Sequence, residues 1–263
     1  MFVHYPKMYS ELWLDLAEMV FANYSHEHYN DCVLICPHQM SDHTTQYRSM
    51  YPGSKLIAYN TEPVHKNHWI SIDWLISSFK EVDEVWDYDI QNIEIWKNYG
   101  IDAKFKPIQY TPVLKRIQNV EEPDIDVLFF GSPTIYRGKY VSDFCLSSII
   151  PDEEMHIQHS IKFISGYQIF GKLKDELTSR SKIILNMAPY SGARQQQFRI
   201  AYDLINNKCV LSEKASYNYF DDMIVEYEDP NDLAAKIRYL LRDDNWKQYT
   251  NNSFEDYCKR KYK

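Results

Sequence analysis

Glycine is scarce in this chain. Only 7 of the 263 residues are glycine, which excludes collagen-like and glycine-rich repeat architectures. No run of about 18 apolar residues occurs, so we expect no membrane-spanning helix. The first residues show no basic stretch followed by an apolar segment, so we expect no secretory signal. A composition of 44% hydrophobic and 25% charged residues is typical of globular domains and argues against disordered and fibrous classes.

Several common sequence signatures are also absent. The 5 cysteines match neither a zinc-site spacing nor a small disulfide scaffold, which indicates a reducing compartment and a cytoplasmic location. No Gly-x-Gly-x-x-Gly or Gly-x-Ser-x-Gly occurs, which argues against a nicotinamide dehydrogenase and a serine hydrolase. The formal net charge is 29 − 37 = −8, which argues mildly against a dedicated nucleic-acid binder but leaves room for a local basic patch.

Short apolar runs alternate with amphipathic stretches along the chain. Runs such as 32–36 and 56–59 are apolar at every position, which is typical of strands that are buried on both faces of a parallel sheet. The alternation therefore predicts an α/β fold. The expected strands are 2–5, 32–36, 56–59, 84–86, 126–130, 155–158, 183–185, 209–211 and 223–225, and the expected helices are 9–24, 70–79, 90–99, 139–149, 169–179, 195–206, 230–242 and 246–261.

Residues 107–124 interrupt this pattern, because they carry three prolines, interspersed charges and no regular period. We interpret them as a linker between two doubly wound units. The predicted division is an N-terminal Rossmann-like domain at 1–106, the linker at 107–124, a second Rossmann-like domain at 125–242, and a C-terminal helix at 243–263 that can return to the first domain. The competing interpretation is one larger mixed sheet.

Three loops of the second half, 131–138, 186–194 and 212–217, follow expected strand ends, which is where open parallel sheets bind ligands. The loop 131–138 begins with Gly131 and Ser132 and contains Arg137. Glycine lets a ligand approach the backbone, and hydroxyl and guanidinium groups donate to phosphate. The loop 186–194 begins with Asn186. An ordinary strand-to-helix turn with a surface arginine explains the first loop equally well.

The helix that follows carries a polar stripe. Arg194 lies at its expected start, and Arg199 is four residues from both Gln195 and Asp203, so these side chains share one helical face. Apolar residues such as Phe198 lie on a separate face. The stripe can therefore face a ligand cleft, and the alternative is an ordinary solvated helix face.

Taken in order, these segments resemble the nucleotide-sugar-binding half of GT-B glycosyltransferases over 126–241. The stretch 203–213 looks like the second acidic residue of the family's helix and the strand that follows it. The resemblance implies that Asp203 holds the donor ribose and that Arg137 and Arg199 meet the diphosphate. Gln195 stands where many members carry the first acidic residue, which is a departure from the family pattern. The first half resembles the acceptor domain less specifically, at 58–63 and 84–92.

The resemblance implies two Rossmann-like domains facing a cleft, and a hexosyl- or pentosyltransferase that uses a nucleotide sugar, most simply a UDP-sugar. Arginines and helix-end amides can neutralise the leaving diphosphate without a metal, so we expect a metal-independent enzyme with no cofactor beyond the donor. The expected donor contacts are Gly131, Ser132, Arg137, Asn186, Arg194, Gln195, Arg199 and Asp203.

Transfer to a hydroxyl also needs a general base. Glu62 follows the strand at 56–59 and is the first choice, with Asp42 and His43 as alternatives. A loop glutamate without a role fits the sequence equally well. His65 and His68 could join Glu62 at a metal, but a fourth ligand is lacking, so we expect no metal site.

The pattern Asp87-Tyr88-Asp89 has the spacing of a metal-binding pair, but it lies in the half assigned to the acceptor. Asp89 precedes the helix at 90–99 directly, and aspartate is a favoured N-cap residue. We therefore expect Asp89 to cap that helix.

The acceptor stays open at this level. Enzymes of this kind include viral ones that glycosylate hydroxymethylated pyrimidines in DNA, so a bacteriophage DNA-modifying enzyme in the host cytoplasm is one expectation. That acceptor requires a flipped base and a basic groove. The candidate groove residues are Lys7, Arg48, Lys66, Lys104, Lys106, Lys115 and Arg116. The alternatives are a glycan acceptor, and a non-catalytic two-lobed module that binds a nucleotide or a sugar.

Overall fold

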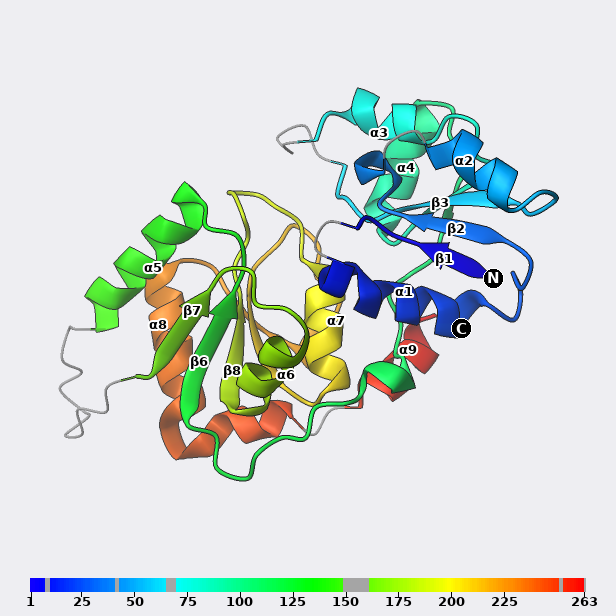
Figure 1. The fold of residues 1–263 in the computed structure, drawn as a ribbon. Helices are drawn as coiled ribbons and strands as arrows, with labels where there is room; N and C mark the ends of the chain where they lie inside the picture. Colours follow the sequence, from blue (N-terminus) through cyan, green and yellow to red (C-terminus); the bar gives the residue numbers. More distant parts are fainter. Residues whose placement is uncertain (8–9, 41–42, 65–69, 149–160, 251–252, 263) are drawn as a thin grey trace. The chain divides into compact units, whose positions relative to one another are not determined.

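The computed structural model describes residues 1–7, 10–40, 43–64, 70–148, 161–250 and 253–262. It contains two compact units. Unit 1 comprises Met1–Leu114 and Cys258–Lys263, and unit 2 comprises Lys115–Tyr257. Each unit holds one five-stranded sheet, and the strand pairs described in both sheets are parallel (Figure 1). The chain passes from unit 1 to unit 2 after Leu114, inside the proline-containing segment 107–124.

Unit 1 is built around a sheet with the strand order β1-β2-β3-β4-β5. Its strands are β1 (Phe2–His4), β2 (Cys32–Ile35), β3 (Leu56–Asn60), β4 (Glu84–Asp87) and β5 (Ala103–Phe105), and its helices are α1 (Ser10–Tyr24), α2 (His43–Met50), α3 (Ile72–Ser78) and α4 (Ile90–Asn98). Among the described residues, two hydrophobic clusters pack against one face of this sheet. Ala58, Leu75 and Trp96 belong to one, and Cys32, Leu34 and Leu56 belong to the other.

Unit 2 has the strand order β10-β9-β8-β6-β7. Its strands are β6 (Ile125–Phe130), β7 (Phe163–Gly166), β8 (Ser181–Asn186), β9 (Cys209–Glu213) and β10 (Val225–Tyr227), and its helices are α5 (Ile135–Ser148), α6 (Gly171–Ser179), α7 (Gln197–Ile205) and α8 (Pro230–Leu241). The last helix of the chain, α9 (Phe254–Lys261), spans the boundary between the units.

The side chains of β6 alternate between two cores, as a strand buried on both faces requires. Val127 and Phe129 pack in a cluster that includes α8, and Leu128 and Phe130 pack in a cluster that includes Ile169, just before α6. Consecutive residues of one strand therefore reach opposite faces of the sheet. Figure 1 shows α5 and α8 side by side at one face of this sheet.

Several element boundaries differ from the sequence-based expectations. Helix α5 begins at Ile135 rather than near 139, because Thr134 Oγ1 accepts a hydrogen bond from Arg137 N at 3.1 Å and caps the helix there. The strand expected at 155–158 lies outside the described residues. The helix expected at 246–261 is wrong as one element: a 3-10 segment covers Arg242–Tyr249, and α9 is separate.

The predicted cap of the helix at 90–99 is confirmed. Asp89 is the N-cap of α4, and its Oδ1 accepts from Gln91 N at 2.8 Å. Asp229 caps α8, with Pro230 at the first helical position. Both helices therefore begin where the sequence placed a carboxylate that can accept the unpaired amide hydrogens of the first turn.

Candidate functional site

The carboxyl ends of β6, β8 and β9 lie next to one another in the sheet of unit 2, because these strands are hydrogen-bonded neighbours. The strands end at Phe130, Asn186 and Glu213. The segments that follow carry most of the predicted donor contacts. This edge of the sheet is therefore the candidate functional site.

Arg137 is anchored to two of these segments. Its Nε and Nη2 donate to the Met187 carbonyl oxygen at 3.2 and 2.8 Å, and its Nη1 donates to the Ser132 carbonyl oxygen at 2.9 Å. The guanidinium lies 5.3 Å from the centroid of the Phe129 ring. The side chain is 4% exposed, and burial lowers its pKa to about 10. Arg137 therefore ties the loop after β6 to the loop after β8.

Gly131 makes this anchor possible. A Cβ atom at this position would lie 3.0 Å from Arg137 Nη1 and 3.1 Å from the tip of the Phe129 ring. Such contacts are tight, so a side chain here would require the guanidinium or the ring to shift by a few tenths of an ångström. The group that lies against Gly131 is Arg137, and the approach of a ligand to this backbone stays a prediction.

Glu213 was not among the predicted site residues. It ends β9, and its Oε2 accepts from the backbone amide of Ala188 at 2.9 Å while its Oε1 accepts from the Tyr136 hydroxyl. Its charge opposes the lowering of the Arg137 pKa by burial. Its position at a strand end was the available sequence signal, since the loop that begins there had been identified as ligand-facing.

Arg199 lies in α7 and approaches the same strand end from the other face. Its guanidinium is 5.0 Å from the centroid of the Phe130 ring, and Phe130 is the residue after Phe129 in β6. Burial, and then the positive charge of Arg137, lower the Arg199 pKa to about 10. Two cations thus crowd the end of β6, one from each face, and Arg199 Nη1 is buried without a hydrogen-bond partner among the described residues.

Further unpartnered polar atoms lie close to Arg199 in the sequence. Among the described residues, nine buried side-chain nitrogen or oxygen atoms have no hydrogen-bond partner, and five of them fall between Asn186 and Asp203. These five are Asn186 Oδ1, Gln196 Oε1, Gln197 Nε2, Arg199 Nη1 and Asp203 Oδ1. Buried polar groups are ordinarily satisfied, so these atoms are available to bind water or a polar ligand.

Asp203 is almost fully buried, with 1% of its surface exposed. Burial raises its pKa to about 7, and the positive charges of Lys174, Arg199 and Lys208 oppose that shift. Lys208 is itself 3% exposed, donates to the Ser179 and Ser181 carbonyl oxygens, and has a pKa lowered to about 8 by burial. Asp203 therefore sits inside the unit as a counter-charge for buried cations.

Gln195 has structural partners. Its Oε1 accepts from Tyr219 N at 2.9 Å, and its Nε2 donates to Glu226 Oε1 at 3.2 Å. Arg194 is half-buried one residue earlier. Ser132 is exposed and offers its carbonyl oxygen to Arg137.

In unit 1, Glu62 lies just after β3 and is held in place through its backbone. The Glu62 carbonyl oxygen accepts from Asn60 Nδ2 at 2.8 Å and from Asn92 Nδ2 at 2.9 Å. Both amides also donate to Asp87, whose carboxylate accepts from Trp96 Nε1 at 2.7 Å as well. Burial raises the pKa of Asp87 to about 7, although its N–H donors favour the ionised form.

The Glu62 carboxylate faces a histidine that the sequence analysis did not select. His38 Nε2 is 3.7 Å from Glu62 Oε1, and its side chain is fully buried. Of the other predicted bases, Asp42 lies outside the described residues. His43 is the first residue of α2, and its side chain is outside the described part of the structure.

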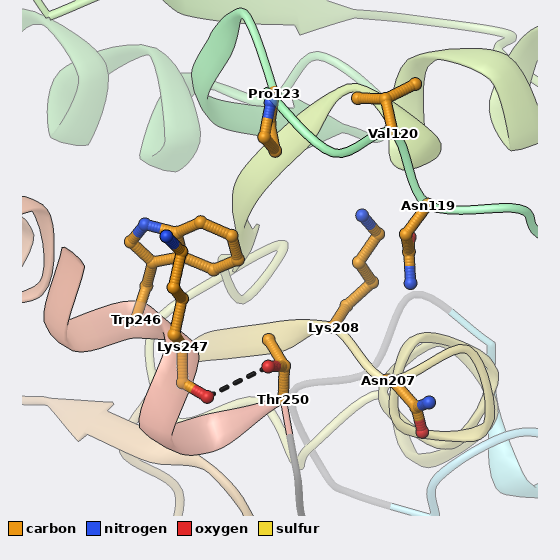
Figure 2. Close-up of a pocket in the computed structure, with 8 residues that line it drawn as sticks. All are labelled: Asn119, Val120, Pro123, Asn207, Lys208, Trp246, Lys247 and Thr250. Carbon is orange, nitrogen blue, oxygen red and sulfur yellow. Dashed lines mark hydrogen bonds between the residues drawn. The ribbon is translucent and has the colours of Figure 1, made fainter.

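A cavity of about 250 Å³ lies at the opposite edge of the unit 2 sheet, near the amino ends of β6 and β9. Figure 2 shows Trp246 and Lys247 on one side of it, and Lys208 with Asn119 on the other. Its lining is completed by Val120, Pro123, Asn207 and Thr250. The predicted donor contacts are not part of this cavity.

Among the described residues, no helix has the length and apolar character needed to cross a membrane. No protein-family model and no curated protein matches the chain.

Solved structures match the fold across most of the chain. TarM has a TM-score of 0.57 at 11% identity, with 95% of this chain and 55% of TarM covered. Anabaena HepE in complex with UDP-glucose has a TM-score of 0.57 at 11% identity, covering 94% of this chain and 78% of HepE. A TarM variant from S. aureus, in complex with fondaparinux, alpha-GlcNAc-glycerol and UDP, has a TM-score of 0.59 at 11% identity, covering 95% of this chain and 56% of the other.

The chain thus spans little more than half the length of TarM. These neighbours are GT-B glycosyltransferases. Two parallel five-stranded sheets with alternating helices match their Rossmann-like halves, so the predicted α/β fold class is confirmed: this chain has the GT-B fold.

Proposed function

We propose that this protein is a glycosyltransferase that moves a sugar from a nucleotide-sugar donor, a UDP-sugar, to an acceptor hydroxyl. The observation that carries the proposal is the Arg199 guanidinium, whose buried Nη1 lacks a partner while a second guanidinium, that of Arg137, stands at the same strand end. Two solved structures with this fold contain UDP or UDP-glucose, which supports the choice of donor.

The chemistry of the leaving group fits this pair of cations. When the bond between sugar and diphosphate breaks, negative charge develops on the diphosphate oxygens, and preorganised donors that meet this charge accelerate the reaction. Arg199 supplies such a donor from α7, whose N-terminal end follows β8 and adds its amide dipoles. Bound phosphate would also relieve the repulsion between Arg137 and Arg199.

Within this proposal the two arginines have different tasks. Arg137 holds the loops after β6 and β8 in register through its bonds to the Ser132 and Met187 carbonyl oxygens. Arg199 is the better candidate for direct contact with the diphosphate. The buried Asp203 is better placed to balance the charge of Arg199 than to bind a ribose.

For the acceptor, we propose that Glu62 takes the proton of the attacking hydroxyl, with His38 beside it. The side chain of Glu62 is 15% exposed, so solvent still reaches it. A base of this kind contributes about 10²–10⁴-fold to the rate. Glu62→Gln should therefore abolish most of the turnover while the affinity for UDP is unchanged.

We propose a glycan hydroxyl as the acceptor in preference to a hydroxymethylated base in phage DNA. Four members of the predicted basic groove form ion pairs with acids. Arg48 pairs with Asp83 at 2.7 Å and Lys104 with Glu84 at 2.7 Å. Arg116 pairs with Asp175 at 3.0 Å and Lys106 with Glu27 at 3.7 Å. Lys66 lies outside the described residues. If DNA were the acceptor, DNA binding would weaken steeply with added salt; a flat or absent response supports the glycan.

The donor is tested by thermal unfolding with millimolar UDP, UMP or UDP-glucose. A ligand present at about 100 times its Kd stabilises the folded state by about 2.7 kcal/mol. We expect UDP to raise the Tm more than UMP does, because the second phosphate meets Arg199. If no nucleoside diphosphate or nucleotide sugar raises the Tm, the proposal is wrong.

One observation favours a second function, a non-catalytic module that binds a nucleotide or a sugar. Gln195 occupies the position where the family often carries an acidic residue, and its side chain is bonded to Tyr219 and Glu226. A binding module would show the Tm increase with UDP-glucose but release no UDP with any glycan acceptor, and Glu62→Gln would leave its properties unchanged.

A further inference from the structure

Three side chains with metal-binding atoms converge in unit 1, at the carboxyl ends of β2 and β3. The Cys36 thiol, the His38 imidazole and the Glu62 carboxylate each offer one ligand atom, and these atoms all lie within 4.8 Å of one another. Cys36 and the His38 side chain are fully buried, and the Glu62 side chain is 15% exposed. The cluster is thus shielded from solvent except beside Glu62.

Two of the three separations are close to those around a tetrahedral zinc ion. Zinc binds sulfur at about 2.3 Å and nitrogen or oxygen at about 2.0–2.2 Å, so tetrahedral angles place sulfur and nitrogen roughly 3.6 Å apart and nitrogen and oxygen roughly 3.4 Å apart. Cys36 Sγ is 3.5 Å from His38 Nε2, and Nε2 is 3.7 Å from Glu62 Oε1. Cys36 Sγ also lies 3.8 Å from His38 Nδ1, so the imidazole must turn for Nε2 to point at an ion that is held by all three side chains.

The backbone holds two of these ligands in place. Cys36 has a left-handed conformation with φ 54° and ψ 50°, which is uncommon for a residue other than glycine and turns the chain sharply after β2. Strain of this kind persists where the surrounding structure enforces it, often at functional sites. Glu62 is fixed by the Asn60 and Asn92 amides, both bonded to the buried Asp87.

We propose that unit 1 binds one zinc ion through Cys36 Sγ, His38 Nε2 and Glu62 Oε1, with a water molecule in the fourth position. A thiolate, an imidazole and a carboxylate together favour zinc over magnesium or calcium, which prefer oxygen ligands. Three protein ligands and one open position are typical of zinc sites that bind water or substrate.

The proposed site differs from the sequence-based expectation that the chain holds no metal, and that expectation stays untested. The pattern Cys-x-His was not recognised, because its third ligand comes from the next strand of the sheet. The proposal stands apart from the donor site in unit 2, since zinc binding is measured without any sugar donor. In the zinc-loaded protein Glu62 is a ligand, so the acceptor base would then be the bound water, whose pKa zinc lowers to about 7.

The test begins with the unmodified protein. After incubation with zinc and dialysis against metal-free buffer, we expect elemental analysis to find one zinc per chain. Cobalt(II) in place of zinc should give intense visible bands of tetrahedral geometry and a near-ultraviolet band from thiolate to cobalt. Absence of retained zinc together with absence of the thiolate band overturns the proposal, whatever the outcome of the UDP experiments.

Variants then identify the ligands. Cys36→Ser should abolish the thiolate band, and His38→Gln and Glu62→Gln should each weaken zinc binding by at least about 100-fold, since even outer-shell changes cost about 10–100-fold. Cys32→Ala is the matched control, because Cys32 is another buried thiol in the same strand region and lies outside the cluster. Retention of the cobalt band in Cys36→Ser would refute the assignment. If that variant does not fold, Glu62→Gln, at the partly exposed ligand, decides the question.

Discussion

Replacing Arg199 by methionine should leave the ligand-free protein at least as stable as the unmodified one, while abolishing its stabilisation by UDP. Methionine retains the packing against the Phe130 ring but removes the charge. If Arg199 instead stabilised the fold through a buried ion pair, its replacement would lower stability, because breaking such a pair destabilises a protein by about 3–5 kcal/mol.

The expected change in stability follows from the cost of burying the Arg199 charge. Burial and the positive charge of Arg137 lower the Arg199 pKa by more than two pH units, to about 10. At about 1.4 kcal/mol per pH unit, this corresponds to roughly 3 kcal/mol of destabilisation by the charged form at neutral pH. Because the Arg199 side chain is half-buried, solvent screens part of this destabilisation. The substitution also removes the cation–π contact with Phe130 and a positive charge near Asp203, and both losses reduce the gain in stability further. We expect a net change between zero and about 1.5 kcal/mol in favour of folding, which is an increase in Tm of up to about 6 °C.

Arg137→Met is the matched comparison and should have the opposite sign. It removes three hydrogen bonds to the Ser132 and Met187 carbonyl oxygens. Bonds from charged donors contribute about 1.5–3 kcal/mol each and are not additive, so we expect a loss of about 2–4 kcal/mol. Urea unfolding of both variants, with and without UDP, provides the measurement. If Arg199→Met destabilises the ligand-free protein as much as Arg137→Met does, the assignment of Arg199 to a ligand is refuted.

Three further predictions concern single residues. Gly131→Ala should lower the Tm and the response to UDP, because its Cβ would lie 3.0 Å from Arg137 Nη1. The control is Gly138→Ala, which has open space around the added Cβ and should raise stability by about 0.5–1 kcal/mol. Equal effects of the two substitutions would contradict this account. The pKa of Asp87 is raised to about 7, so stability should fall as pH rises from about 4 to 7, and Asp87→Asn should flatten that part of a pH series of urea unfolding curves. The pKa of Lys208 is lowered to about 8, so stability should rise with pH between about 8 and 10.5, and Lys208→Met should remove the rise; a variant that keeps it shows that another group titrates.

The strands were predictable because a parallel strand covered on both faces must be apolar at nearly every position, as in 32–36 and 126–130. The exceptions have physical reasons. Strand β5 was missed because it is short and places the exposed Lys104 between its two apolar residues. Helix α2 was missed because it is predominantly polar, so no apolar stripe reveals its period.

The site residues were predictable only where their position after a strand end identifies them. Arg137 and Arg199 were identified because they follow strand ends, but the carbonyl oxygens that Arg137 binds could not be inferred, since backbone acceptors carry no sequence signature. The same holds for the partners of Gln195, which lie in distant segments. The convergence of Cys36 with Glu62 depends on the left-handed backbone at Cys36, which residue types alone do not indicate.

The path of the chain through the two units has a practical consequence for protein engineering. Because Cys258–Lys263 belong to unit 1, a hybrid that exchanges unit 2 for that of another enzyme needs two junctions, one after Leu114 and one after Tyr257. A graft with a single junction would leave the first half without its own terminal segment. The second junction falls within α9, so the residues on both sides of this junction must still form one continuous helix.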